Sequence, residues 1–220
     1  MLMIKIISVV GARPNFIKIA PVYRAFQKYT DRAIHKICHT GQHFDTNMSR
    51  VFFEELEIPA PDFNLGIHGG SHARQVAKIM MEFEKVLLQE KPDLILVPGD
   101  VNSTMAVTLV ASKMGIPVGH IESGLRSFDR TMPEEINRIL TDHCADLLFC
   151  PTETAVNNLE KEGFSNIANN GKLIEEELSE KELSAFPAPW NPKAIPLGSF
   201  QLSPLVINVG DTMYDAVSGI

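Results

Sequence analysis

Short apolar runs alternate with amphipathic stretches along most of this chain, and that alternation constrains the fold more than any other feature. Two of the runs, Ile4–Val10 and Leu94–Pro98, are nearly continuous in Ile, Leu and Val, which is typical of strands buried on both faces of a sheet. Strands that alternate with helices predict a parallel sheet joined by right-handed crossovers. We therefore expect an α/β fold built on a doubly wound parallel sheet of the Rossmann type.

The periodicity of apolar residues sets approximate bounds for the elements. The expected strands are Ile4–Val10, His35–His39, Leu94–Pro98, Pro117–Ile121, Leu147–Cys150 and Leu205–Val209. The expected helices are Phe16–Tyr29, Asp45–Glu57, Ser71–Gln89, Asn102–Met114, Pro133–Cys144 and Glu153–Glu162. Ser71, Asn102 and Thr152 are expected to cap helices, and Pro133 is expected in a first turn. The order of the strands in the sheet does not follow from this pattern.

Residues 166–204 interrupt the rhythm with a charged stretch and several prolines. Such a composition favours a surface insertion, and the alternative is a linker that contacts another domain or subunit through Phe186 and Trp190. We expect residues 1–165 to form a Rossmann-like lobe and residues 166–204 a proline-rich insertion or linker. Residues 205–220 then supply a final strand and a helix start leading to a C-terminal lobe that is absent from this chain.

Charge and cysteine content narrow the class of protein. The net charge is −7, which disfavours nucleic acid or an anionic membrane surface as a partner. No apolar run approaches the ~18 residues of a membrane helix, and the N-terminus does not read as a signal peptide. Cys38, Cys144 and Cys150 lack metal-type spacing, so we expect buried, reduced thiols in a cytoplasmic protein and no metal site.

The residues that follow the predicted strands are polar, and ligands of parallel α/β sheets bind at the carboxyl ends of the strands. After the first strand, the turn Gly11–Asn15 opens a helix and offers backbone N–H groups and the guanidinium of Arg13 to a phosphate. This turn is not the GxGxxG fingerprint, so a nicotinamide cofactor is not indicated. After the second strand, His43 is a candidate donor to a sugar or diphosphate oxygen. The alternatives are a surface arginine and a structural loop histidine.

Two carboxylates, Asp100 and Glu122, follow two of the predicted strands. If those strands are neighbours, they lie only ~5 Å apart at one edge of the sheet. Carboxylates so close can hold different protonation states, which suits acid–base chemistry. The alternative for Asp100 is capping of the helix that follows it, whereas Glu122 is a poor capping residue.

Glu134 and Arg138 lie four residues apart on one expected helix face and can form an ion pair. The plain interpretation is a surface pair of little energetic value. The other interpretation places the start of this helix over the ligand site, with Glu134 as a third carboxylate and Arg138 beside it.

Several post-strand motifs, taken in order, resemble the UDP-N-acetylglucosamine 2-epimerase family of non-hydrolysing type, in its N-terminal lobe. The motifs are Gly11-Ala12-Arg13-Pro14-Asn15, Thr40-Gly41-Gln42-His43, Gly99-Asp100-Val101-Asn102-Ser103-Thr104, His120-Ile121-Glu122-Ser123-Gly124-Leu125-Arg126, Pro133-Glu134-Glu135-Ile136-Asn137-Arg138, Pro151-Thr152-Glu153 and Gly210-Asp211-Thr212-Met213-Tyr214-Asp215. Each motif is weak alone, but six or more in order are specific.

The resemblance implies one lobe of a two-lobed fold like that of glycosyltransferase-B enzymes, with the substrate between the lobes. Members of this type interconvert UDP-N-acetylglucosamine and UDP-N-acetylmannosamine without cofactor or metal. The implied route eliminates UDP to give 2-acetamidoglucal and re-adds it with inverted C2 configuration. It also implies a homodimer, and a second lobe that supplies a catalytic histidine and most UDP contacts. On that basis, the 220 residues alone are expected to have negligible activity.

Residue by residue, Asp100, Glu122 and Glu134 are similar to the family's catalytic acids, and Arg138 to the arginine that accompanies them. Arg13 is similar to an arginine that holds UDP. Gln42, His43 and Arg74 fall where some bacterial members bind a second, activating substrate molecule. Which carboxylate acts as the base stays open.

Three other functions remain open at this point. The hydrolysing type of 2-epimerase would release N-acetylmannosamine and UDP. A stand-alone nucleotide-sugar-binding module would bind UDP-sugars without turnover. A glycosyltransferase lobe is disfavoured by the clustered acids after the strands.

Overall fold

The computed structural model describes residues 3–41, 56–174 and 204–211. Within these residues, parallel strands form a single sheet in the order β3-β2-β1-β4-β5-β6-β7. The strands are β1 (Ile4–Val10), β2 (Ala33–His39), β3 (Phe63–Asn64), β4 (Leu94–Pro98), β5 (Val118–Ile121), β6 (Leu147–Cys150) and β7 (Leu205–Asn208). The helices are α1 (Arg13–Phe26), α3 (His72–Glu90), α4 (Asn102–Lys113), α5 (Pro133–Cys144) and α6 (Glu153–Lys161), with 3₁₀ turns η1 (Gln27–Tyr29) and η2 (Ala168–Gly171). The doubly wound parallel fold is confirmed.

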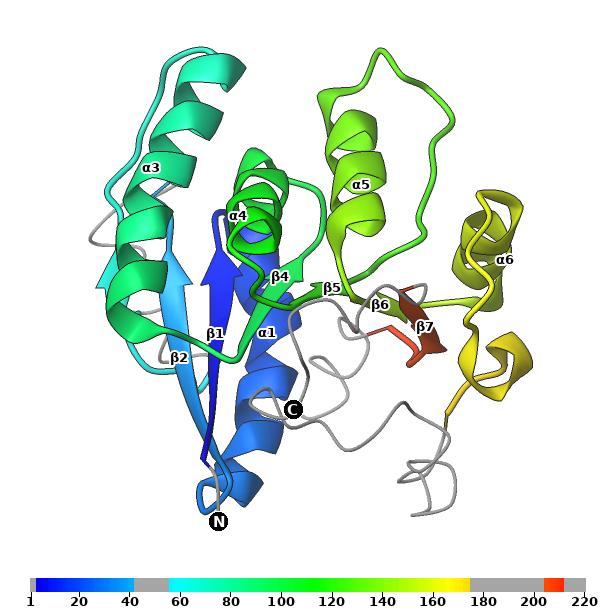
Figure 1. Ribbon diagram of the computed structural model, residues 1–220, viewed down its shortest axis with the longest axis horizontal. Helices are drawn as coiled ribbons and strands as arrows, with labels where there is room; N and C mark the ends of the chain where they lie inside the picture. Colours follow the sequence, from blue (N-terminus) through cyan, green and yellow to red (C-terminus); the bar gives the residue numbers. More distant parts are fainter. Residues whose placement is uncertain (1–2, 42–55, 175–203, 212–220) are drawn as a thin grey trace.

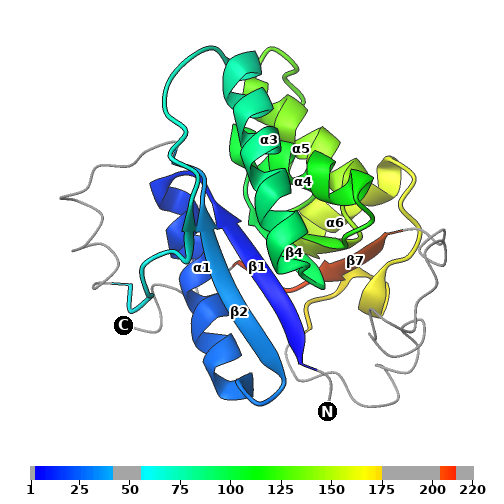
Figure 2. The ribbon, with the colours of Figure 1, turned by 60° about the vertical axis from the view of Figure 1, so that its left-hand side comes forward.

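Helices cover both faces of the sheet, which explains why the central strands are apolar throughout (Figures 1 and 2). In β1, Ile6 and Val10 pack on one side with residues of α1, while Ile7 and Val9 pack on the other side with residues of α3 and α4. Successive side chains of a strand point to opposite faces, so one continuous apolar run serves two cores. All five residues of β4 are buried for the same reason.

The strand order reverses between β1 and β4, and this is where the fold offers a ligand site. From β1 the chain passes through α1 to β2 on one side, and from β4 it passes through α4 to β5 on the other. The two crossovers run on opposite faces of the sheet, so they leave a crevice at the carboxyl ends of the strands at the point of reversal. The residues that follow β1, β4 and β5 therefore meet at one edge.

The boundaries of the elements differ from the sequence expectations in a few places. β2 begins at Ala33, two residues earlier than expected, and α1 begins at Arg13 rather than at Phe16. The two-residue strand β3 was not expected. Ser71 and Thr152 cap α3 and α6 with their side chains, and Pro133 is the first residue of α5, as predicted. Most of the expected helix Asp45–Glu57 lies outside the described residues.

The expectation that Asn102 caps α4 is wrong. The N-cap is Val101, and Asn102 is the first helical residue. Its amide instead donates to Gln75 Oε1 over 2.6 Å and contacts His72 Nδ1 at 3.0 Å, both on α3. Because its polar atoms have partners on a neighbouring helix, Asn102 joins two helices instead of capping one.

β7 belongs to the same sheet as the first six strands. It pairs with β6 in register from Leu147↔Leu205 to Cys150↔Asn208. Phe186 and Trp190 lie outside the described residues, and the division of the chain into three segments stays a prediction. Across the described ranges, no helix is both long enough and apolar enough to cross a membrane.

The three cysteines are free thiols, but they are not equally enclosed. Cys38 and Cys150 are buried, and burial raises the pKa of each thiol to about 12. Cys144, the last residue of α5, is only half-buried. The expectation of three buried thiols is therefore correct for two of them.

Candidate active site

The turn after β1 is tied to the end of β4 by one buried amide. Asn15 Oδ1 accepts hydrogen bonds from the backbone N–H groups of Gly11 (3.1 Å) and Ala12 (2.9 Å), and Asn15 Nδ2 donates to the carbonyl of Pro98 (3.0 Å). The first two contacts lie within the turn, and the third crosses from β1 to β4, where the strand order reverses. Asn15 thus fixes the turn of the first motif against β4, and it leaves Arg13, the first residue of α1, exposed at the edge.

Gly11 is required by close packing at this edge. A Cβ atom at this position would overlap Ser103 Oγ and lie 3.2 Å from Thr40 Oγ1. Those two hydroxyl groups hydrogen-bond each other at 2.7 Å. The ends of β1 and β2 and the first turn of α4 therefore meet without space for a side chain at residue 11.

Glu122 ends β5 in an unusual backbone conformation, with φ of +69°. A non-glycine residue pays about 1–2 kcal/mol for this left-handed region, so the surrounding contacts must favour it. The carboxylate forms an ion pair with Lys18 of α1, and only 13% of the glutamate side chain and 11% of the lysine side chain are exposed. This lysine was not singled out from the sequence. Its position among the apolar residues Phe16, Ile19 and Ala20 of α1 is the signal that could have found it.

The Lys18 ammonium lies over Gly99, between the ends of β4 and β5. A Cβ atom at Gly99, whose φ is +67°, would lie 3.0 Å from Lys18 Nζ and 3.9 Å from Glu122 Oε2. The absence of a side chain at Gly99 therefore makes room for the ion pair directly beside Asp100. β4 and β5 are adjacent and parallel, so Asp100 and Glu122 follow neighbouring strands.

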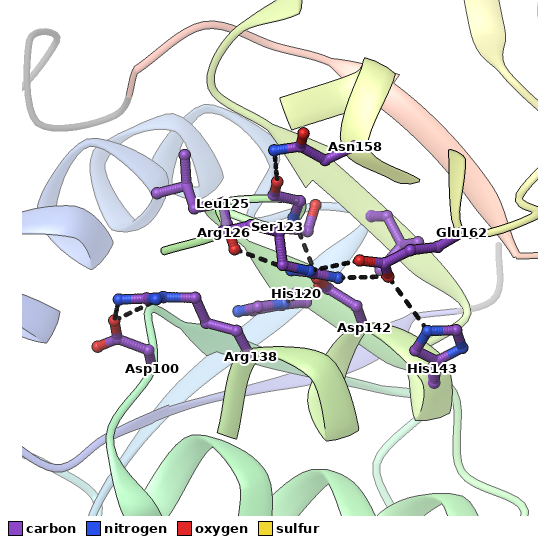
Figure 3. Close-up of polar contacts among 12 residues, drawn as sticks. Asp100, His120, Ser123, Leu125, Arg126, Arg138, Asp142, His143, Asn158 and Glu162 are labelled. Carbon is purple, nitrogen blue, oxygen red and sulfur yellow. Dashed lines mark hydrogen bonds and ion pairs between the residues drawn. The ribbon is translucent and has the colours of Figure 1, made fainter. Parts of the chain in front are cut away.

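Asp100 contacts the arginine that the sequence picked out. Arg138 on α5 donates from Nε (3.0 Å) and Nη2 (2.7 Å) to Asp100 Oδ2, as Figure 3 shows. The amide of Asn137 also donates to the Asp100 carbonyl at 2.8 Å. Since Val101 is the N-cap of α4, Asp100 is not a capping residue, and its side chain is held by α5 at the edge of the sheet.

The expected pair between Glu134 and Arg138 is not formed. Arg138 Nη1 instead donates to Glu135 Oε2 at 2.7 Å. Glu134 is exposed in the first turn of α5, and it makes no hydrogen bond or ion pair with any other residue that the structure describes. The helix is rotated so that position 135, rather than position 134, faces the interior.

Glu135 organises the loop that follows β5. It is 1% exposed and accepts backbone N–H hydrogen bonds from Ser127 (3.0 Å) and Phe128 (2.9 Å) as well as the contact from Arg138. Burial alone would raise the pKa of Glu135, but these donors outweigh it and hold the pKa below its usual value. No local pattern in the sequence favours Glu135 over Glu134, because both residues lie in the first turn of the helix.

Of the remaining candidate residues, the structure describes only Arg74. Arg74 lies exposed in the first turn of α3, where its backbone N–H donates to Ser71 Oγ. Gln42 and His43 lie outside the described residues. The structure therefore brings together Asp100, Glu122 and Arg138, with Lys18 added, while Glu134 and Arg13 lie exposed at the same edge.

This arrangement suits proton transfer near an anionic group. Each of the two strand-end carboxylates has its own cation, Lys18 for Glu122 and Arg138 for Asp100. A carboxylate is a competent general base, and cations close to it can stabilise negative charge that develops on a leaving group.

The family model and the relatives found by comparison with known proteins all bear the names of 2-epimerases. The sequence model described as UDP-N-acetylglucosamine 2-epimerase matches residues 26–193. The chain is 54% identical over 164 residues to a UDP-N-acetylglucosamine 2-epimerase of Methanococcus maripaludis, covering 74% of this chain and 44% of the relative. It is 52% identical over 177 residues to the UDP-2,3-diacetamido-2,3-dideoxy-D-glucuronate 2-epimerase of Pseudomonas aeruginosa, covering 78% of this chain and 49% of that protein.

Solved structures agree with the fold. The Methanocaldococcus jannaschii UDP-GlcNAc 2-epimerase, in complex with UDP-GlcNAc and UDP, matches with a TM-score of 0.71 and 52% identity over 74% of this chain and 44% of that one. The lipopolysaccharide outer core galactosyltransferase WaaB matches at 15% identity with a TM-score of 0.53 over 74% of this chain and 43% of that one, a likeness of fold alone. The chain spans about half the length of the curated relatives it matches.

Proposed function

The chain belongs to the UDP-N-acetylglucosamine 2-epimerase family, and from this premise we propose that the whole protein interconverts UDP-N-acetylglucosamine and UDP-N-acetylmannosamine. The described residues would form one side of the active site. Because the relatives are about twice as long, the 220 residues by themselves are proposed to have negligible activity.

One observation carries the proposal. Asp100 and Glu122 follow adjacent strands at the point where the strand order reverses, and each is paired with a cation. Inversion at C2 needs a base to take the C2 proton and an acid to return a proton to the other face. Two carboxylates at one edge can supply both functions, and Glu134 is a third candidate at the same edge.

The proposed reaction proceeds in two balanced steps. In the first, a base takes the C2 proton, the C1=C2 double bond forms, and the C1–O bond to UDP breaks with its electron pair leaving on the diphosphate. In the second, UDP oxygen adds back to C1 while C2 receives a proton from the opposite face. Arg13 and the N–H groups of the Gly11–Asn15 turn are proposed to hold the diphosphate, in keeping with their place at a helix N-terminus. Lys18 and Arg138 would hold the side chains of Glu122 and Asp100 in place when the substrate arrives.

The identity of the sugar has a second candidate. The Pseudomonas aeruginosa relative, named for a diacetamido glucuronate, is nearly as similar as the relatives named for N-acetylglucosamine. Its reaction also inverts C2, so the same strand-end acids would serve. We favour UDP-N-acetylglucosamine because the solved relative at 52% identity holds that sugar nucleotide.

Three further assignments rest on the family. Gln42, His43 and Arg74 are proposed to bind a second, activating substrate molecule. A homodimer is proposed as the assembly. The hydrolysing reaction, which would release free N-acetylmannosamine and UDP, is the main alternative outcome.

Product analysis tests the proposal directly. The whole protein is incubated with UDP-N-acetylglucosamine, and separately with the diacetamido glucuronate nucleotide, and the products are separated by anion exchange. We expect UDP-N-acetylmannosamine at equilibrium with the substrate and no free sugar. Release of free N-acetylmannosamine with UDP would establish the hydrolysing reaction instead, and turnover of the glucuronate nucleotide alone would establish the other substrate.

A further inference from the structure

A buried carboxylate lies behind the strand-end acids without being one of them. Asp142 on α5 is fully buried, and its Oδ1 lies 2.6 Å from Nδ1 of the equally buried His120 in β5. The other ring nitrogen, His120 Nε2, lies 2.8 Å from the carbonyl oxygen of Gly99. The ring of His120 therefore bridges a carboxylate oxygen of Asp142 and the backbone carbonyl of Gly99. Asp142 thereby reaches, through His120, the residue directly before Asp100.

The second oxygen of Asp142 reaches the other acid-bearing segment. Asp142 Oδ2 accepts the backbone N–H of Gly124 at 3.1 Å and Arg126 Nη1 at 2.7 Å. Gly124 lies two residues after Glu122, and its carbonyl accepts a hydrogen bond of 3.0 Å from Asn158 of α6. Figure 3 shows this arrangement, with Asp142 between the ring of His120 and the guanidinium of Arg126.

The network extends through Arg126 to a second carboxylate, Glu162. Arg126 donates from Nε (2.7 Å) and Nη2 (2.8 Å) to the two oxygens of Glu162, and His143 lies 3.2 Å from the same carboxylate. Burial alone would raise the pKa of Asp142, but His120 and Arg126 beside it hold the pKa below its usual value. An ionised carboxylate in this position keeps both of its oxygens as acceptors.

The segments that Asp142 holds have left-handed backbone conformations. Gly99, Glu122 and Gly124 have φ values of +67°, +69° and +76°. Glycine adopts this conformation without strain, but Glu122 does not, so the contacts around Glu122 must hold it there. One carboxylate therefore links the backbone on the two sides of the pair Asp100 and Glu122.

We propose that Asp142 and His120 are positioning residues for epimerisation: by holding the Gly99 carbonyl and the Gly124 N–H, they set the spacing of Asp100 and Glu122. This inference rests on the proposed function, since it assumes that those two acids act on the substrate. Neither Asp142 nor His120 touches the substrate in this account. Their role is to hold the ends of β4 and β5 at a fixed spacing.

The chain offers a matched control at the opposite end of the same strand. Asp146 Oδ2 accepts the backbone N–H of Val118 at 2.9 Å, at the start of β5, and burial raises the pKa of its carboxyl. Each of the variants Asp142→Asn and Asp146→Asn replaces a carboxylate that accepts a backbone N–H with an amide. Asp142 lies beside the strand-end acids, whereas Asp146 lies at the other end of β5.

The test measures kcat, KM and thermal stability of the whole protein with UDP-N-acetylglucosamine. We expect Asp142→Asn to lower kcat by ~100-fold with KM within about threefold, because small misplacement of catalytic groups acts mainly on the transition state. Asp146→Asn is expected to keep kcat within about threefold. If the two variants show the same kcat, Asp142 is a structural residue and the inference is wrong.

Two further measurements keep the inference testable. If Asp142→Asn does not fold, His120→Gln, which retains a side-chain donor, carries the same comparison and is expected to lower kcat with little change in KM. If the wild-type protein has no epimerase activity, the proposed function is wrong, but the positioning role of Asp142 can still be tested. Hydrogen exchange then shows whether Asp142 holds the Gly124 amide. Faster exchange of the Gly124 amide in Asp142→Asn than in Asp146→Asn would support it, and equal rates would overturn it.

Discussion

The two strand-end acidic residues at the carboxyl edge of this sheet are each held in place by a cationic side chain. Glu122 has a left-handed backbone and a nearly enclosed side chain paired with Lys18. Asp100 has two hydrogen bonds from Arg138. Buried pairs of this kind contribute little net stability, because desolvation of the charges opposes their attraction. Their presence at a strand edge is better explained by chemistry than by folding.

His35 makes the stability of the fold depend on pH. Its Nε2 lies 2.7 Å from Ser8 Oγ, and its Nδ1 is buried without a hydrogen-bond partner among the residues described. Burial lowers the pKa of His35 to about 4, and Asp62 offsets this only in part. The unfolded chain therefore binds a proton that the folded protein rejects between pH 6.5 and pH 4.

We expect stability to fall across this window, by up to about 3 kcal/mol from His35 alone. The contribution is fully present above pH 6.5 and is lost as the pH drops toward 4. Urea unfolding of the wild type and of His35→Gln at several pH values measures it as a difference between the two proteins. Equal slopes with pH for both proteins would contradict the assignment.

Asp100 and Glu122 could be picked out from the sequence because ligands of parallel sheets bind at the carboxyl ends of the strands. Arg138 was picked out by its spacing from Glu134 and by the family resemblance. The sequence did not identify Lys18, Glu135 or Asp142. Each of these lies inside a helix, where an ionisable side chain normally faces solvent, and only the rotation of the helix shows that it faces inward. For the same reason the spacing of Glu134 and Arg138 suggested a pair that the structure replaces with Glu135 and Arg138.

At the scale of elements, the part of the β5–α5 loop at Ser127 and Phe128 is held by the side chain of Glu135. Glu135 accepts the N–H groups of Ser127 and Phe128, and Phe128 is 76% exposed with φ of +60°. An exposed aromatic residue in a left-handed conformation gains little from its own packing. The contacts of Glu135 are therefore what fix this part of the loop.

We expect Glu135→Gln to destabilise the protein by about 3 kcal/mol, since the change leaves Arg138 without one buried partner. The loop should also become open to trypsin at Arg126 and Arg130. Denaturant unfolding and limited proteolysis measure the two effects.

Glu134→Gln is the matched control for Glu135→Gln, one position earlier on the same helix and exposed. It should change stability by less than about 0.5 kcal/mol and leave the loop resistant to trypsin. Similar behaviour of the two variants would mean that Glu135 does not order the loop.

Three strands, β1, β4 and β6, have the bounds that the sequence predicted, although β6 is only partly buried. β1 and β4 have the expected bounds because a run of Ile, Leu and Val has a strong signal at both ends. β3 contains only Phe63 and Asn64, too few residues for any periodicity. The start of α1 was placed three residues late because the whole Gly11–Asn15 motif was interpreted as a turn, although its proline is well suited to the first turn of a helix.

At the scale of the molecule, the strand order is what unites the candidate residues. The order is a long-range property that no local pattern encodes, so the sequence predicted a doubly wound sheet without predicting which strands are neighbours. Once β1 and β4 are adjacent, the Gly11–Asn15 turn, Asp100 and Glu122 share one edge. The relatives at above 50% identity place this chain in a family of sugar-nucleotide epimerases, of which it spans about half the length.

The central claim is that the strand-end acids transfer the C2 proton of a UDP-sugar. Incubation of the whole protein with UDP-N-acetylglucosamine in D2O, followed by ¹H NMR of the C2 position, tests this most directly. We predict that wild type introduces deuterium at C2 of both epimers. Asp100→Asn and Glu122→Gln should lower the rate by ~10²–10⁴-fold, the usual contribution of a general acid or base. Glu160→Gln, an exposed residue of α6, should match wild type. Exchange at the wild-type rate in folded Asp100→Asn and Glu122→Gln would contradict the account.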